Sequence, residues 1–186
     1  MEPDDIVRRC QQGDLEEFES LYQEFAGKIY KFVYRRVGHK ETAEDLTSQI
    51  FIKALNNLKK FTAEKGSFSA WIYRISRNTV IDYYRTRKSI MDVSEFWGIS
   101  AKDNISQEFA NKEALAKIGE SLKKLKPEQQ EIIIMRVWDD LSYKEIAQIT
   151  GKSEANCKVI FSRAMRKLRE TIPLQLLLLF FICSKL

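Results

Sequence analysis

Cationic and aromatic side chains are interleaved along residues 69–88, a combination that suits the binding of nucleic acid. On a helix four of the five basic residues fall within an arc of about 80°, nearly opposite an apolar face. Charges in such a stripe can follow phosphates, while the rings of Trp71, Tyr73 and Tyr84 can stack on bases of a single strand. A solvated charged surface over core aromatics is the alternative. The four basic residues in this arc are Arg74, Arg77, Arg85 and Lys88.

Residues 142–170 have the pattern of two helices joined by a tight turn. Ser142 and Glu145 form a capping box that opens a short first helix. Gly151 supplies the turn and Ser153 caps the second helix. The second helix has an apolar face and an opposite face of basic and short side chains, as a helix in the major groove of DNA needs. A plain charged helix is the alternative. The candidate DNA contacts are Asn156, Lys158, Val159, Ser162, Arg163 and Arg166.

Catalytic and metal chemistry have little basis in these residues. His39 is the only histidine, and it follows Gly38 in a polar turn, which argues against a histidine-based active site or a metal site. The three cysteines lie far apart without a CxxC pair, which fits a reducing cytoplasm. No phosphate-binding glycine loop or serine-hydrolase motif occurs. We expect no enzyme activity, no metal and no cofactor.

The composition favours an all-α fold and an anionic partner. Of 186 residues, 44% are hydrophobic and 31% charged, and seven glycines and three prolines are too few for a turn-rich β protein. The net charge of +5 is unevenly distributed. Residues 71–88 and 152–170 each carry a net charge of +4, whereas residues 1–27 carry −6. The sequence therefore predicts two separate basic surfaces.

Apolar periodicity predicts two small helical domains joined by a flexible acidic linker. Helices are expected over roughly 15–36, 41–59, 69–88 and 127–138, with helical spacing also from Leu115 to Leu125. Residues 89–111 are acidic and show no period. The expected organisation is an acidic N-terminal segment 1–14, a first domain 15–88, a linker 89–111, a second domain 112–172 and a tail 173–186.

The two ends of the chain have opposite character. The N-terminus has no signal-peptide pattern, so we expect a cytoplasmic protein, and its acidic residues are a candidate shield for the basic surfaces. The apolar run 176–183 is far shorter than the ~20 residues of a membrane span. We expect the tail to form a terminal helix that docks on the body or on a partner, with contact to a membrane surface as the alternative.

Four stretches resemble the sigma-70 family of bacterial transcription initiation factors, most closely its small extracytoplasmic-function group. They occur in family order and at family spacing over most of residues 15–170. The sequence departs from the family pattern at Ser48-Gln49, usually Gln-Glu, and at the start of the second basic helix, Glu154 to Cys157. The four stretches are ETAEDLT running into FIKAL (41–55), residues 68–85, LKPEQQE (125–131) and LSYKEIA continuing to Arg169 (141–169).

The resemblance implies a sigma factor that directs promoter recognition, DNA melting and transcription initiation. The domains would be sigma region 2 and region 4, and the loop 61–68 with helix 69–88 would melt the −10 element and read it as a single strand, with an extruded base against the loop. Helix 154–170 would read the −35 element in the duplex. The implied −10 contacts are Phe61, Lys65, Trp71, Arg74, Arg77, Asn78 and Arg85.

The implied partners are core RNA polymerase, promoter DNA and an anti-sigma protein, which could also tether the chain to a membrane, with no small-molecule substrate. Docking on the clamp helices of the β′ subunit would use Glu44, Asp45, Gln49 and Lys53, and a second contact would be made with the β subunit. The acidic linker would thread near the RNA path. A stand-alone helix-turn-helix regulator is the alternative function, but it leaves the helix 69–88 without a role.

Overall fold

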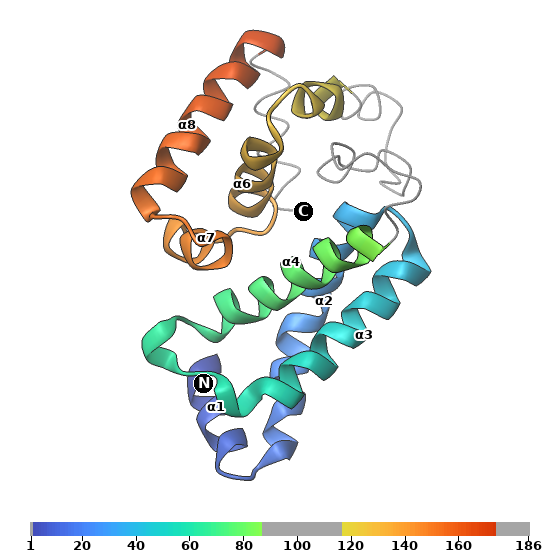
Figure 1. Cartoon of the computed structure of the whole chain (residues 1–186), viewed down its shortest axis with the longest axis vertical. Helices are drawn as coiled ribbons and strands as arrows, with labels where there is room; N and C mark the ends of the chain where they lie inside the picture. The colour runs from blue at the N-terminus through green and yellow to red at the C-terminus, as the bar shows by residue number, and fades with distance from the viewer. Residues whose placement is uncertain (1, 87–116, 174–186) are drawn as a thin grey trace.

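A computed structural model describes residues 2–86 and 117–173, which contain helices and no strand (Figure 1). This confirms the expected all-α fold. The first range contains α1 (Pro3–Gln11), η1 (Leu15–Glu17), α2 (Phe18–Val37), α3 (Lys40–Asn57), η2 (Leu58–Lys60), η3 (Ala63–Lys65) and α4 (Phe68–Thr86). The second contains helical residues 117–123, α6 (Pro127–Val137), α7 (Tyr143–Thr150) and α8 (Glu154–Thr171). The expected linker, 89–111, and the tail after Pro173 lie outside the described residues.

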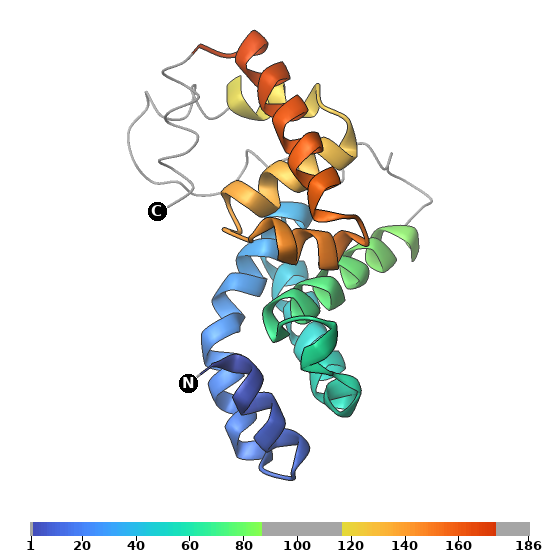
Figure 2. The same cartoon turned by 90° about the vertical axis from the view of Figure 1, so that its left-hand side faces the viewer.

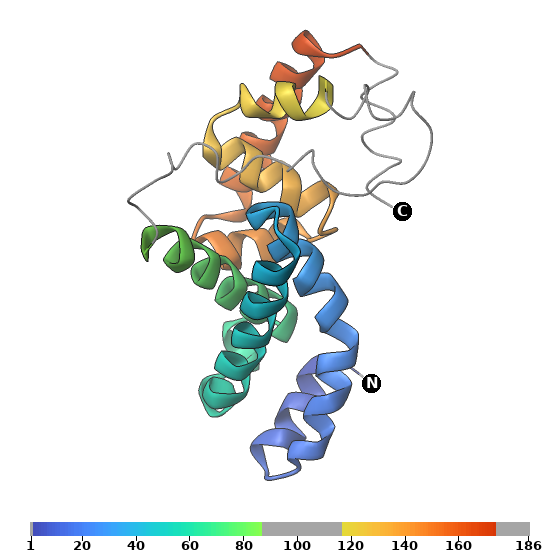
Figure 3. The ribbon, with the colours of Figure 1, turned by 90° about the vertical axis from the view of Figure 1, so that its right-hand side faces the viewer.

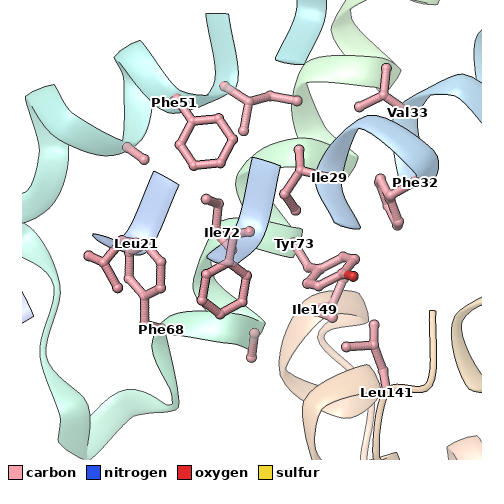
Figure 4. Packing of buried hydrophobic residues seen from close by; sticks show 14 of the residues in the cluster. Leu21, Ile29, Phe32, Val33, Phe51, Phe68, Ile72, Tyr73, Leu141 and Ile149 are labelled. Carbon is pink, nitrogen blue, oxygen red and sulfur yellow. The ribbon is translucent and has the colours of Figure 1, made fainter. Parts of the chain in front are cut away.

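Helices α2, α3 and α4 form the body of the first unit. Gly38 ends α2 with a positive φ of 63°, and the ring of His39 caps α3 by accepting a hydrogen bond from the Thr42 amide. The single histidine therefore has a structural role. Apolar side chains at helical spacing meet in the interior, where Ile29 and Ile72 are fully buried (Figure 4). Burying each such side chain contributes about 1.5–3 kcal/mol.

The acidic N-terminal segment forms α1, which runs beside the first half of α2 (Figure 3). Ile6, Val7 and Cys10 are buried in the core of the first unit. The Asp4 carboxylate accepts a 2.7 Å hydrogen bond from the Phe68 amide at the start of α4. The segment thus anchors the unit through its apolar face and this helix-start contact, which its negative charge did not predict.

Helices α6, α7 and α8 form the second unit, and its local signals agree with the sequence. Ser142 and Glu145 make both hydrogen bonds of the capping box at α7. Gly151 has a φ of 71°, and the Ser153 hydroxyl accepts from the Asn156 amide at 3.2 Å. Together α7 and α8 make the expected helix-turn-helix.

The two units pack against each other. In Figures 1 and 2 the α6–α8 unit sits at one end of the α1–α4 unit, with α7 against α4. One cluster of buried residues runs across the junction, and Tyr73 lies beside Leu141 and Ile149 from the second unit (Figure 4). Within residues 2–86 and 117–173, no helix is both long enough and apolar enough to cross a membrane.

Candidate nucleic-acid interface

The outer face of α4 carries part of the expected basic stripe, and Lys88 lies outside the described residues. Arg74, Asn78 and Arg85 are exposed, and on the opposite side of the helix Ile72 and Thr79 are buried. Arg85 also pairs with Asp82 one turn away, with 3.0 Å between nitrogen and oxygen. Both partners are largely exposed, so this pair is weak and leaves the guanidinium available to another anion.

A small cavity lies between the 61–68 loop and the first turns of α4. Its volume is about 40 Å³, and its walls include Lys65, Trp71 and Arg74. Phe61 is only 6% exposed, with its ring centroid 5.5 Å from that of Trp71. Phe61 therefore lines the cavity with a ring that is almost fully buried, whereas Trp71 is half-buried and presents part of its ring. The sequence analysis expected both residues to contact DNA and did not predict that one ring is buried and the other partly exposed.

Helix α1 fixes one side of this loop. The Gln11 side-chain amide donates hydrogen bonds of 2.9 Å to the carbonyl oxygens of Leu58 and Phe61. These two carbonyls lie at the start and end of the turn that leads into the loop. Gln11 therefore positions the cavity wall, a role without a recognisable sequence signal because its partners are backbone atoms about 50 residues away.

Arg77 already has a partner in the second unit. Its Nε lies 2.6 Å from Glu131 Oε1, and its Nη2 lies 3.3 Å from Glu131 Oε2. The two side chains form a bidentate ion pair between α4 and α6. The Glu131 side chain is 5% exposed. Gln148 of α7 covers the same region, because a Cβ on Gly66 would lie 2.6 Å from its Oε1. Neither partner was among the residues expected from the sequence.

A second set of ion pairs joins the two units, between α2 and the residue Asp139 that follows α6. The Asp139 carboxylate pairs with Arg35 and Arg36 of α2, and none of its side chain is exposed. Burial lowers the pKa of the Arg36 guanidinium to about 10, and the nearby Asp139 carboxylate opposes this shift. Burial also raises the pKa of Tyr73, which lies in the same junction.

Helix α8 presents the whole set of candidate duplex contacts to solvent. All six side chains are exposed, including the apolar Val159, which is 45% exposed. Lys158 pairs with Glu154 at 2.7 Å, so the acidic residue at the helix start is partly neutralised within its own helix. The opposite face, with Cys157, Ala164 and Leu168, is buried. The exposed residues are Asn156, Lys158, Val159, Ser162, Arg163 and Arg166.

Helix α3 presents the candidate polymerase-docking residues. Glu44, Asp45, Gln49 and Lys53 are all exposed, and Lys53 also donates a 3.0 Å hydrogen bond to the Thr79 hydroxyl of α4. Two exposed apolar residues of the same helix, Ile52 and Leu55, were not among the residues expected from the sequence.

The first of these residues, Ile52, is 59% exposed, and the second, Leu55, is 41% exposed. Leu55 borders a groove of about 430 Å³ that Leu15 and Tyr22 also line. Apolar residues off the buried stripe of a helix are the signal that would have found them.

Two parts of the chain match models of known protein families. The family model described as Sigma-70 region 2 matches residues 21–90, and the one described as Sigma-70, region 4 matches residues 115–168. The two matches together cover more than half of the chain. The chain belongs to the sigma-70 family.

Relatives of this sigma factor include extracytoplasmic-function (ECF) members. The ECF RNA polymerase sigma factor BldN of Streptomyces coelicolor is 32% identical over 91% of this chain, which spans 65% of that protein. The RNA polymerase sigma factor YlaC of Bacillus subtilis is 32% identical over 83% of this chain and 91% of its own length.

A solved structure shares the fold. The sigma factor RpoE in complex with the anti-sigma factor NepR from Bartonella quintana has a TM-score of 0.65 at 21% identity, covering 84% of this chain and 96% of that one.

The family matches place the two candidate reading helices in different regions of the sigma factor. Helix α4 lies within the region 2 match, and α7 and α8 lie within the region 4 match apart from the last residues of α8. Sigma factors of this family direct RNA polymerase to promoters and are initiation factors rather than enzymes. The function expected from the sequence is therefore confirmed at the level of the family.

Proposed function

We propose that this sigma factor is a cytoplasmic, dissociable promoter-recognition subunit without catalytic activity of its own. It gives core RNA polymerase two separate DNA-reading surfaces. The observation that carries this proposal is the exposure of a polar, basic face on α8 and of Arg74, Asn78 and part of Trp71 on α4, each within its own sigma region. One surface suits duplex DNA and the other suits a single strand.

The α4 surface reads the −10 element after strand separation. Trp71 offers a ring for stacking, and Arg74 with Lys65 offers cations for the neighbouring phosphates. An unpaired base enters the loop cavity once that cavity widens. Bases can make these contacts only in the open duplex, so binding to this surface favours melting. Phe61 supports the site from within, and Arg77, Asn78 and Arg85 extend it along the helix.

The α8 surface reads the −35 element in the major groove. Arg163 and Arg166 reach guanine edges or phosphates, and Ser162 and Val159 are small enough for close approach of the helix. Because Glu154 is already paired with Lys158, its charge repels DNA less than an isolated carboxylate would. The regions would stand at a fixed separation on the polymerase, which sets the spacing between the two elements.

The exposed face of α3 docks on the clamp helices of the β′ subunit. Asp45 and Gln49 supply polar contacts, and Ile52 supplies apolar area beside them. A contact of the region 4 unit with the β subunit completes core binding. An anti-sigma protein is a further partner, as in the solved RpoE complex, and it would be the route to any membrane tether.

Transcription from a random promoter library tests this function. Purified core polymerase, with or without the full chain, transcribes a library whose products are sequenced at their starts. Protein-dependent starts that share two motifs at a fixed distance are expected. The absence of such starts, together with specific duplex binding by the chain alone, would instead support a stand-alone regulator. In that case binding would weaken steeply with salt.

A further inference from the structure

The α4 surface proposed to read the −10 strand is partly covered by the chain's own region 4 unit, at Arg77 and at the loop cavity. Helix α7 packs against α4 (Figure 1), and Glu131 of α6 brings a carboxylate to Arg77 of α4. The two units are packed together, since one cluster of buried apolar residues contains side chains from both of them. What α6 and α7 place on α4 resembles what a DNA strand would place there.

Glu131 takes the position of a phosphate. Its two oxygens meet the Arg77 guanidinium at 2.6 and 3.3 Å, the fork geometry in which arginine also binds phosphate. The Glu131 side chain is 5% exposed and that of Arg77 is 24% exposed, so water screens this pair poorly. A phosphate can reach this guanidinium only after the carboxylate leaves.

Gln148 takes the position of a base. Its side-chain amide lies over Gly66 and forms part of the wall of the loop cavity. The cavity volume is about 40 Å³, and Gln148 narrows the cavity from the side of the region 4 unit. The amide group also carries a donor and an acceptor, as the edge of a base does.

The remainder of the junction holds these two groups in place. Leu141 and Ile149 pack beside Tyr73, and Asp139 is buried against Arg35 and Arg36. A buried carboxylate between two cations fixes the register of the second unit on the first. The strand and the region 4 unit therefore cannot occupy Arg77 and the loop cavity together.

We propose that the region 4 unit is a competitor in cis of the −10 strand, with Glu131 and Gln148 standing in for phosphate and base. This inference rests on the proposed function and adds its regulation. The free chain is closed, and its apparent affinity for single-stranded DNA is reduced by the fraction of molecules that are open. Core polymerase, by holding the two regions apart, releases α4 for the promoter.

Single-strand binding by the full chain without polymerase tests this proposal. The probe is a fluorescein-labelled pool of random single-stranded DNA, because stacking and phosphate contacts need no particular sequence. Glu131→Gln should lower the Kd for single-stranded DNA about fivefold or more, and Gln148→Ala should also lower it. Glu128→Gln is the matched control, since it removes the same charge from α6 but breaks a pair with Lys152 inside the second unit.

Small-angle X-ray scattering on the same proteins gives a reading that needs no DNA. The radius of gyration should rise in Glu131→Gln and in the double variant with Gln148→Ala, and stay unchanged in Glu128→Gln. Gln148 is half-buried, so its truncation also serves if Glu131→Gln folds poorly. Unchanged Kd and unchanged radius of gyration in both test variants would overturn the proposal.

The two proposals fail in different ways. Protein-dependent transcription starts, combined with variants that neither open nor bind more tightly, would leave the sigma function intact and reject competition in cis. No starts, combined with opening in the Glu131 and Gln148 variants, would reject the proposed function while the closed contact stands. Equal tightening by Glu128→Gln would show a general charge effect and would also reject the competition.

Discussion

Trp71 is the single residue on which the melting step depends most directly. Its ring packs at 5.5 and 5.7 Å from Phe61 and Phe68 and is otherwise half exposed beside Arg74. Trp71→Ala should weaken open-complex formation by about 1–3 kcal/mol, the value of one stacked base. Binding to closed duplex promoter should change much less. Permanganate reactivity of the melted strand and a gel-shift assay measure the two steps.

A control separates stacking from folding in this test. Trp71→Phe keeps an aromatic ring on the same packing partners and should retain most of the open complex. Circular dichroism melting of both variants shows whether the fold survives. Equal losses in melting and in duplex binding by Trp71→Ala would contradict a role in strand separation.

The buried thiols provide a second test at the scale of residues. Burial raises the pKa of Cys157, and it also raises the pKa of Cys10, where the charges of Asp14 and Glu17 add to the effect. Thiolate is the reactive form, so raising the pKa lowers reactivity at neutral pH. Iodoacetamide should modify both slowly near pH 7 and faster as the pH rises towards 9 and above. Peptide mass spectrometry that found either thiol reacting as fast as free cysteine at neutral pH would contradict this.

The sequence spacing alone predicts which side chains of α4 and α8 are exposed. It does not predict which residues they pair with. Arg74 on α4 and Arg163 on α8 point to solvent because both lie opposite an apolar stripe. Arg77 belongs to the same stripe as Arg74, yet its partner is 54 residues away in sequence. Phe61 is a lone aromatic in a polar loop, and only the fold shows that it is buried.

Helix α1 acts as a brace for the loop that follows α3. Gln11→Ala removes one hydrogen bond to each of the Leu58 and Phe61 carbonyls. The Leu58 carbonyl keeps its bond from the Phe61 amide, and each lost bond costs about 0.5–1.5 kcal/mol. We expect a lower free energy of unfolding and weaker binding of single-stranded DNA. Urea unfolding and fluorescence anisotropy measure these effects. Gln12→Ala is the matched control because the side chain of Gln12 is exposed. Identical results for both variants would refute the brace.

Most helices could be predicted from apolar periodicity, and the exceptions have physical causes. The expected helix 15–36 begins as the 3-10 turn η1, and the expected helix 41–59 passes into η2 after Asn57. Helix α1 was missed because it buries only Ile6, Val7 and Cys10 among many charged residues. Its role depends on packing against the first unit, which no local pattern encodes.

At the scale of the whole molecule, the shared core predicts one unfolding transition. Buried residues of α7 join the cluster of α2 and α4, so opening one unit exposes apolar surface on the other. Differential scanning calorimetry of the wild type should give a single transition. The double variant Glu131→Gln/Gln148→Ala should shift towards two transitions as the units uncouple. Two separate transitions in the wild type would contradict a shared core.

Two domains could be read from the sequence, but their closed arrangement could not. The composition change at residues 89–111 and the two basic blocks are local signals, and the matches to two sigma regions agree with them. The junction depends on pairs far apart in sequence, such as Arg35 with Asp139, which are separated by 104 residues. A single charged residue in a helix does not reveal which distant partner it will meet.

The most direct test of the account is library transcription with one variant for each reading surface. Core polymerase with wild-type protein, Trp71→Ala or Arg163→Ala transcribes the same promoter library, and the starts are sequenced. Arg163→Ala should relax base preference in the upstream motif alone, by about 1–3 kcal/mol at the contacted position. Trp71→Ala should reduce initiation and leave the base preference in the upstream motif unchanged. If both variants changed the same motif, or neither changed any, two separate reading surfaces on α4 and α8 would be contradicted.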